Sequence, residues 1–470
     1  MANYIHITVV ALYLVFMIIM GMYYAKKEVK TSEDFMVAGR RLPSLVLIGT
    51  LLATWVGSGT VVGGASFIYQ YGPFAALIYF AGAPLGIIVL YFIADKARVR
   101  AKYTIPEMLE IRFGKKTRLI SAVFILLAYV GITSYQFIGG GYVLNITTGM
   151  PVEVGTMITA FIVIFLATTG GLFSVAYTDF LSSFLIVFGF LIGVPLALYL
   201  AGGFEGLAQN IPEQKLTWNG GLTTAQILGF FLPTFLLILG DQNMYQRFSA
   251  AKDPQSAKKS TIGFFLGDVL IVILSITLAT CSIVLFPNIA PDTAILELAA
   301  KGFPTVMGSL ILASCVAFII TTGNSYLLSS AGNLVYDLIK SFKKDAVPEE
   351  NLLGFNRIVV IILGILAYAM GQFFPSVLSI QMYSYTMYGA AITPTIIASF
   401  LWKRATTAGA ISSIITGGLA TLFWELVLGK PMGWNSILFS LPLSILALIV
   451  VSLFTINKPQ PLDQNTISIK

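Results

Sequence analysis

The sequence predicts an all-α integral membrane protein with thirteen transmembrane helices, and three observations support this prediction. The chain of 470 residues is 57% hydrophobic and only 10% charged, whereas soluble domains carry about 25% charged residues. Its apolar residues form thirteen segments, each long enough to cross a hydrocarbon layer about 30 Å thick. Its basic residues, which produce the net charge of +7, lie mostly between those segments. So much apolar surface does not fit a soluble domain, which excludes a soluble enzyme, a disordered chain and a nucleic-acid-binding protein.

The expected spans follow one another with short connections. They are residues 4–24, 44–70, 73–94, 119–144, 154–173, 178–201, 223–245, 260–286, 304–337, 354–374, 376–401, 408–428 and 434–456.

The distribution of basic residues predicts the orientation of these spans. With the N-terminus outside, 25 of the 28 lysines and arginines fall in the segments that would be cytoplasmic, including the C-terminal tail. The other three, Lys215, Lys301 and Lys430, fall in outer loops. Cytoplasmic loops are enriched in Lys and Arg, so we expect a multi-pass protein of the cytoplasmic membrane with its N-terminus outside and its C-terminus inside.

The chain offers no recognisable catalytic apparatus. It has one histidine, His6, and two cysteines, Cys281 and Cys315, which lie inside apolar stretches. These residues build neither a histidine metal cluster nor a paired-cysteine metal site. No connection is long enough for a nucleotide-binding domain, and the spans offer no nucleophile–base pair. We therefore expect no enzyme activity and no organic cofactor.

Two of the expected spans contain interruptions. Span 44–70 carries Ala53-Thr54-Trp55-Val56-Gly57-Ser58-Gly59, and span 223–245 carries Gly240-Asp241-Gln242-Asn243. Unwound backbone frees N–H and C=O groups that must face protein or an internal cavity, where they can bind a cation or a solute. The alternative for the first span is that Gly59 and Gly63 merely allow close helix packing.

The two interrupted spans lie five apart and therefore run in opposite directions. This predicts an inverted repeat of spans 2–6 and 7–11 with discontinuous first helices. The expected organisation is an N-terminal anchor helix and loop (1–43), a first five-helix repeat (44–203), a second, inverted repeat (204–402), and two C-terminal helices with a tail (403–470).

Polar residues also gather inside the ninth span, at Thr321-Thr322-Gly323-Asn324-Ser325. Hydroxyls and unwound carbonyls supply the oxygen ligands that a small hard cation prefers, although threonine and serine also bond to the preceding helical turn. Asp179 either contacts a cation on its path near the cytoplasmic face, or is an acid in the first turn of a helix that interacts with the helix dipole. Asp241 is either a counter-charge in a cavity, or a helix cap or ion-pair partner of Arg247.

Four motifs resemble those of the sodium/solute symporter family over nearly the whole chain. They are Ala53-Thr54-Trp55-Val56-Gly57, the stretch from Gly170-Gly171 to Thr178-Asp179, the stretch from Tyr245-Gln246-Arg247 to Lys252, and Trp402-Lys403-Arg404-Ala405-Thr406-Thr407-Ala408-Gly409-Ala410. The strings around Trp55 and Asp179 are similar to those of the family's high-affinity choline transporters. The resemblance implies a five-plus-five inverted-repeat fold and coupling to sodium.

The resemblance also implies specific sites. The main sodium site would use the carbonyls of Ala53, Val56 and Phe318 and the hydroxyls of Thr321 and Thr322. A second cation site or pathway would use Asp179, Asn324 and Ser325, although the asparagine departs from the serine of members that bind two sodium ions. Asp241 and Gln242 match a position that contacts substrate in some relatives.

These observations together predict a sodium-coupled symporter that imports a small organic solute. Aromatic and acidic side chains favour an amino- or ammonium-bearing solute over a sugar, through charge pairing and cation–π contact. The expected solute-binding residues are Trp55, Gln136, Asp241, Gln242 and Tyr385. The alternatives are a proton-coupled or uncoupled carrier on the same fold, with Asp179 or Asp241 as the titrating group, and a membrane-embedded sensor or channel. The expected partners are the solute and the lipid bilayer, with no nucleic acid.

Overall fold

The computed structural model describes residues 4–100, 104–342, 348 and 351–455. The tail from residue 456 onwards, which was expected to be cytoplasmic, lies outside the described residues, as do Lys102, Lys343 and Lys344. The long helices are α1 (Tyr4–Glu28), α3 (Ser44–Trp55), α5 (Pro73–Tyr91), α8 (Lys115–Thr148), α9 (Val152–Leu200), α11 (Thr224–Gly240), α13 (Pro254–Leu285), α15 (Thr305–Gly332), α17 (Leu352–Gly371), α18 (Val377–Ala391), α20 (Thr407–Leu422) and α21 (Ile437–Phe454). The shorter ones are α2 (Ser32–Val37), α4 (Ala65–Tyr71), α6 (Ala94–Arg100), α7 (Ile105–Phe113), α10 (Gly203–Asn210), α12 (Gln242–Ala250), α14 (Ala294–Glu297), α16 (Lys340–Phe342) and α19 (Thr393–Leu401).

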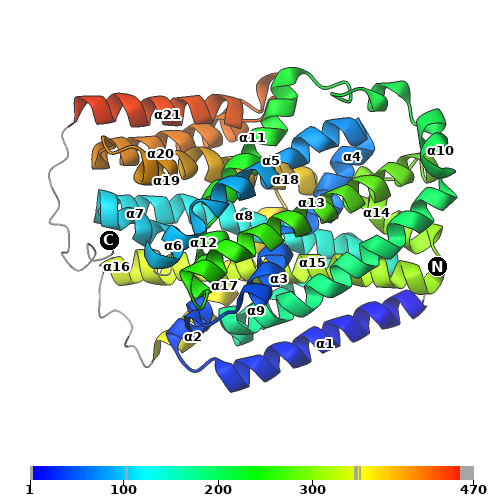
Figure 1. Cartoon of the computed structure of the whole chain (residues 1–470), viewed down its shortest axis with the longest axis horizontal. Coiled ribbons are helices and arrows are strands. Elements are labelled where there is room, and N and C mark those ends of the chain that lie inside the picture. Colours follow the sequence, from blue (N-terminus) through cyan, green and yellow to red (C-terminus); the bar gives the residue numbers. More distant parts are fainter. Residues whose placement is uncertain (1–3, 101–103, 343–347, 349–350, 456–470) are drawn as a thin grey trace.

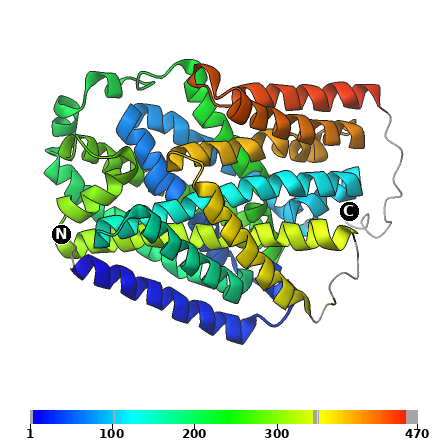
Figure 2. The same ribbon diagram turned by 180° about the vertical axis from the view of Figure 1, so that it is seen from behind.

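Helix α15 forms the centre of the bundle. It packs against α8, α9, α1 and α3, and it crosses the middle of the molecule in both views, while α1 and α21 lie at opposite edges (Figures 1 and 2). Nearly every residue from Gly308 to Gly332 is buried. Because α15 is shielded from lipid, it can carry the polar residues that a lipid-facing helix could not.

The number of spans is where the structure and the sequence prediction differ. Among the described residues, ten helices are long and apolar enough to cross a membrane, or eleven if the bent pair Ser44–Trp55 and Gly59–Tyr71 is one span. Helix α9 has 49 residues, roughly 70 Å at 1.5 Å per residue. It covers the two expected spans 154–173 and 178–201 and bends at Gly171 (φ 55°, ψ −179°), near the end of the first. The expected span 376–401 is divided into α18 and α19, with 15 and 9 residues. The count of thirteen therefore stays a prediction.

Both predicted interruptions are present. Helix α3 ends at Trp55, Val56 is extended (φ −83°, ψ 111°), and the chain resumes after a bend of 52°. Helix α11 ends at Gly240, and Asp241 (φ −58°, ψ 113°) starts α12. Close packing also contributes in the first span, because a Cβ at Gly63 would lie 2.3 Å from Gln381 Oε1.

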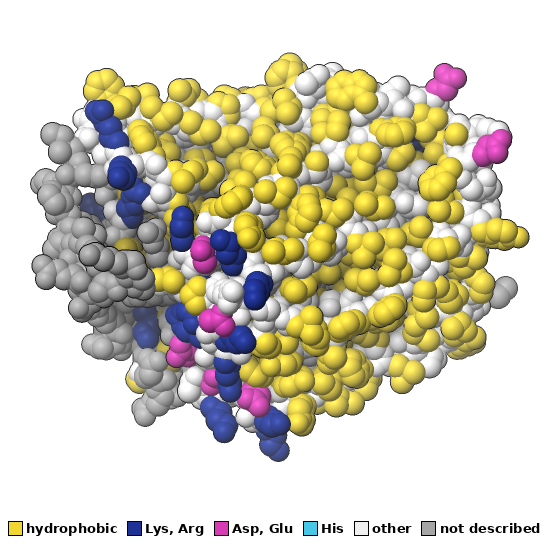
Figure 3. All heavy atoms as spheres, in the orientation of Figure 1, with side chains coloured by type: hydrophobic (Ala, Val, Ile, Leu, Met, Phe, Trp, Pro, Cys, Tyr) yellow, Lys and Arg dark blue, Asp and Glu magenta, His cyan; other side chains and the backbone are white. Residues whose placement is uncertain are grey.

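The surface has the pattern expected of a membrane protein. Hydrophobic side chains cover a broad belt, and lysines and arginines form an oblique band on one side of it (Figure 3). We call the side that carries this band the basic end; it includes Lys26, Lys27, Arg40 and Arg41, which follow α1. Helix α1 begins at the opposite end of the molecule (Figure 1).

Candidate ion and solute site

Five oxygen atoms meet where α3 breaks beside the middle of α15. The Thr321 hydroxyl lies 2.8 Å from the Ala53 carbonyl oxygen and 3.1 Å from that of Phe318. The Thr322 hydroxyl lies 3.2 Å from the Ala53 carbonyl and 3.0 Å from that of Val56. All five residues are at most 1% exposed. The structure therefore brings together the complete set expected for the main sodium site, which we call the oxygen cluster.

The oxygen cluster has more lone pairs than protons. The chain leaves the helix at Val56, so the Ala53 and Val56 carbonyls face the two threonine hydroxyls instead of amides further along a helix. Thr321 also lies 2.8 Å from the carbonyl of Ala317. Two hydroxyl protons therefore serve five close oxygen–oxygen contacts, an arrangement that a small cation would stabilise.

A second cluster, which we call the charged cluster, lies between α3, α9, α12 and α15. Asp179 Oδ2 accepts a hydrogen bond from the Thr50 hydroxyl at 2.7 Å and forms an ion pair with Arg247 at 3.5 Å. Arg247 Nη2 also donates to Ser325 Oγ at 2.6 Å. Both Arg247 and Asp179 are fully buried. The guanidinium thus occupies the position beside Asp179 and Ser325 where a second cation was expected.

Asn324 stands apart from the charged cluster. Its Oδ1 has no hydrogen-bond partner among the described residues, and no described hydrogen bond joins it to Asp179 or Ser325. Of the three residues expected for a second cation, the structure therefore brings together Asp179 and Ser325.

Asp241 is a helix cap whose two oxygens are both occupied. Oδ1 accepts from the backbone N–H of Asn243 at 2.9 Å and from the Tyr129 hydroxyl, and Oδ2 accepts from the Tyr326 hydroxyl at 2.6 Å. The cap that the sequence suggested is therefore present. The suggested ion pair with Arg247 is not, because Arg247 pairs with Asp179.

Hydrogen bonds and an ion pair close the basic end next to the second break, which lies between α11 and α12. The backbone N–H of Ile105, at the start of α7, donates to Gln242 Oε1 at 3.1 Å. Asp337 accepts from Arg118 at 2.8 Å and from Thr104 at 2.9 Å. These contacts join α7, α8, the break before α12 and the end of the α15 span. Gln242 is therefore part of the closure at the basic end.

A narrow cavity lies beside the first break, next to Trp55 and Val56. It has about 20 Å³ of room for the centres of water molecules, enough for about one water. Its lining is Trp55, Val56, Gly59, Thr60, Tyr79, Phe80, Ala83, Thr234, Asp268, Val272, Gln381 and Tyr385.

Two of the five expected solute-binding residues, Trp55 and Tyr385, line this cavity, and their rings stack with centroids 6.2 Å apart. Gln136 lies behind the break, where its Oε1 accepts from the backbone N–H of Ser58 at 2.8 Å. Asp241 and Gln242 are not among the lining residues.

Sequence reasoning missed several polar residues of the cavity, among them the acid Asp268 and the amide Gln381. Asp268 had a clear signal, because it is the one charged residue between Lys259 and Asp292, and acids inside membrane spans are rare and often functional. Gln381 had a weaker signal, a single amide in a span rich in serine and tyrosine.

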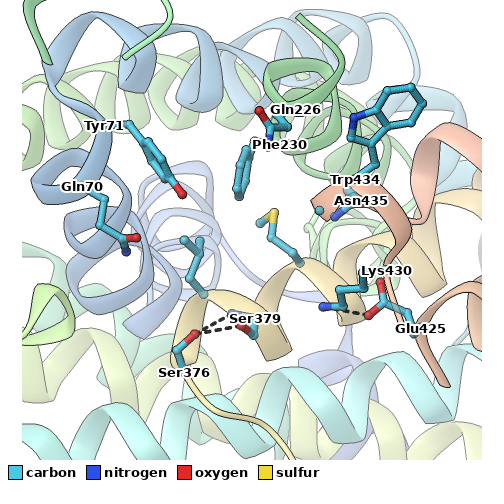
Figure 4. A pocket seen from close by; sticks show the side chains of 13 residues that line it. Gln70, Tyr71, Gln226, Phe230, Ser376, Ser379, Glu425, Lys430, Trp434 and Asn435 are labelled. Atoms are coloured by element: carbon cyan, nitrogen blue, oxygen red, sulfur yellow. Dashed lines mark hydrogen bonds and ion pairs between the residues drawn. The ribbon is translucent and has the colours of Figure 1, made fainter. Parts of the chain in front are cut away.

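A larger pocket, which we call the vestibule, lies near the cavity. It has about 240 Å³ of room and is lined by residues that include Tyr71, Phe230, Ser379 and Trp434, with an ion pair of 2.8 Å between Glu425 and Lys430 (Figure 4). Aromatic rings lie between it and the cavity. Phe67 contacts Phe230 of the vestibule and Tyr79 of the cavity, both with ring centroids 4.8 Å apart.

Comparison with known proteins identifies the family. The model of the sodium:solute symporter family matches residues 35–417. The chain belongs to this family. It is 24% identical to the sodium/pantothenate symporter of Escherichia coli over 91% of this chain and 92% of that protein. It is equally 24% identical to the sodium/proline symporter of Staphylococcus aureus, over 90% of this chain and 86% of that protein.

Solved structures show the same fold. A Na⁺-coupled sialic acid symporter in a substrate-bound outward-open state matches with a TM-score of 0.82 and 18% identity, covering 97% of this chain and 99% of that one. The nucleobase-cation-symport-1 family transporter Mhp1, in a closed conformation, matches with a TM-score of 0.62 and 16% identity, over 92% and 97% of the two chains. The symporter is therefore an all-α multi-pass protein of the plasma membrane with the inverted-repeat fold, and its family consists of sodium-coupled transporters, not enzymes.

Proposed function

We propose that this symporter imports an amino- or ammonium-bearing solute together with sodium, which binds at the oxygen cluster. The convergence of the Ala53, Val56 and Phe318 carbonyls with the Thr321 and Thr322 hydroxyls supports the ion site. The band of lysines and arginines supports a cytoplasmic location for the basic end, which puts the N-terminus outside. Of the described residues, none forms a cluster of His, Cys, Asp and Glu that could hold another metal ion.

The solute binds in the cavity beside the first break. Four aromatic residues line it, Trp55, Tyr79, Phe80 and Tyr385, and Asp268 supplies the acid. Aromatic faces and a carboxylate attract an ammonium group by cation–π contact and charge pairing.

Sodium and solute are coupled through residues 53–56. The Val56 carbonyl belongs to the oxygen cluster, while Val56 and its neighbour Trp55 also line the cavity. An ion that orders this backbone therefore also orders the cavity wall, and a solute that orders the wall improves the ion site, because coupling is reciprocal. Sodium binds first and holds the state that is open to the outside, in which the basic end stays closed by α7.

The transport cycle uses one sodium ion. In the charged cluster, the guanidinium of Arg247 already donates to Asp179 and Ser325. A second sodium ion at Asp179 would have to displace this buried charge, which costs several kcal/mol once its partner is lost.

The test compares the melting temperature of the purified protein in sodium chloride and in potassium chloride at equal ionic strength. Sodium at about ten times its dissociation constant adds about 1.4 kcal/mol of stability, so we expect a sodium-specific rise that Thr321→Ala abolishes. The control is Thr277→Ala, because the Thr277 hydroxyl donates to Ile273 of its own helix at 2.9 Å; this variant keeps the rise. Equal melting temperatures in the two salts would contradict the proposed ion site.

A further inference from the structure

Asp268 is a buried acid without a matching cation. It is 1% exposed and lies in α13, facing the cavity at the first break. Trp55 lines the same cavity, and Asp268 Oδ2 has no hydrogen-bond partner among the described residues. None of the ion pairs found in the described part of the chain includes Asp268.

The other buried acids near the breaks have partners that Asp268 lacks. Asp179 has Arg247 as its counter-ion, although its Oδ1 also has no hydrogen-bond partner among the described residues. Asp241 accepts hydrogen bonds from two tyrosine hydroxyls and one backbone amide. Acids inside membrane spans normally find a partner, and a buried polar atom without one costs free energy. The missing counter-ion of Asp268, together with its place on the cavity wall, therefore points to a partner that arrives with the solute.

The partner must donate a hydrogen bond. A carboxylate oxygen without a donor is best satisfied by a charged N–H group, which forms a short charge-assisted hydrogen bond. A quaternary ammonium has no N–H to donate, so it would leave the Asp268 oxygen without a hydrogen bond.

We infer that Asp268 binds a protonated primary or secondary amino group of the transported solute. The inference rests on the proposed function, because it names the chemistry of that same solute site. The rings of Trp55, Tyr79 and Tyr385 surround the amino group, and Gln381 adds an amide whose Oε1 is also without a partner. Trp55, which lines the cavity together with Asp268, directly precedes Val56 of the oxygen cluster.

The experiment uses the full-length protein and three pairs of probes. The first member of each pair has a primary or secondary amino group, and in the second member that nitrogen is a quaternary ammonium or an amide. The quaternary pairs are ethanolamine with choline and L-proline with N,N-dimethyl-L-proline, and the amide pair is β-alanine with pantothenate. Melting temperatures are measured in sodium chloride as each probe is titrated. We expect at least one amino-bearing member to raise the melting temperature, with an apparent Kd at least about tenfold lower than that of its altered partner.

Asp268→Asn should weaken binding of that amine by about 10- to 100-fold, because a charge-assisted hydrogen bond is lost. It should keep the rise produced by sodium alone, which shows that the fold and the ion site are intact. The matched control is Asp253→Asn at the start of the same helix, where Asp253 caps Ser256 and asparagine caps equally well. Hydrogen bonds from Ser256 hold the pKa of Asp253 below its ordinary value, and this variant should keep the amine response.

Three outcomes would overturn the inference while sodium still stabilises the protein. They are equal binding of an altered partner, an undiminished amine response in Asp268→Asn, and no response to any amino-bearing probe. If sodium does not raise the melting temperature of the unaltered protein, that result would instead contradict the proposed function.

Discussion

The oxygen cluster and the charged cluster lie against the same two helices, α3 and α15, but they are built differently. The oxygen cluster contains carbonyls and hydroxyls with no formal charge. The charged cluster contains an aspartate that already has an arginine as its partner. A small cation would add the missing charge to the first cluster, whereas it would compete with an existing charge in the second. Position beside a helix break is therefore not enough to make an ion site; the local balance of charge decides.

Removing the guanidinium is expected to have the largest effect. Arg247→Gln leaves Asp179 buried and unpaired, and we expect the free energy of unfolding to fall by about 3–5 kcal/mol. The double variant Asp179→Asn/Arg247→Gln should recover most of this loss, because no isolated charge remains. Thermal melting of the two variants in potassium chloride measures the difference. Equal stability of the single and double variants would show that the ion pair does not hold the charged cluster together.

The Arg247→Gln variant also tests the number of bound sodium ions. With the guanidinium gone, sodium can take its place beside Asp179 and Ser325. At high sodium, the free energy of unfolding of this variant should then rise with the logarithm of the sodium concentration about twice as steeply as that of the unaltered protein, because each bound ion adds one unit of RT to the slope. A slope of two ions in the unaltered protein would contradict the single-ion cycle.

Removing one ligand of the oxygen cluster should have an intermediate effect. Thr321→Ala deletes a hydroxyl that lies within 3.1 Å of three carbonyl oxygens. Loss of a ligand to a charged group costs about 1.5–3 kcal/mol, so the sodium concentration for half-maximal uptake should rise by about 10- to 100-fold. Sodium-dependent uptake into proteoliposomes measures it. Uptake that is unchanged at limiting sodium would remove Thr321 from the ion site.

The smallest effect is expected where the oxygen is kept. Thr322→Ser retains the hydroxyl that faces Ala53 and Val56 and removes only a methyl group. The half-maximal sodium concentration should change by less than about twofold, in the same uptake assay. A large loss would mean that the methyl group and its packing, and not the oxygen, make Thr322 important.

Much of the architecture could be predicted from local sequence. Apolar segments, basic loops and the two interruptions each depend on a short stretch of residues, so the breaks at Val56 and Asp241 were expected and are present. The set Ala53, Val56, Phe318, Thr321 and Thr322 was expected from family motifs, and the structure brings it together. The span count could not be read from segment lengths in the same way, because the kinked helix α9 and the divided α18 and α19 do not follow a simple length rule.

Hydropathy and backbone chemistry within a few turns of chain predicted that this protein crosses a membrane repeatedly and where two of its helices are interrupted. The oxygens of the ion site were expected from the resemblance to family motifs. The partner of each buried charge could be read only from the packed helices. Asp241 meets two tyrosines, Arg247 meets Asp179, and Asp268 faces the cavity without a cation. These partners lie on different helices far apart in the chain, and the rotation and packing of those helices determine which side chains meet.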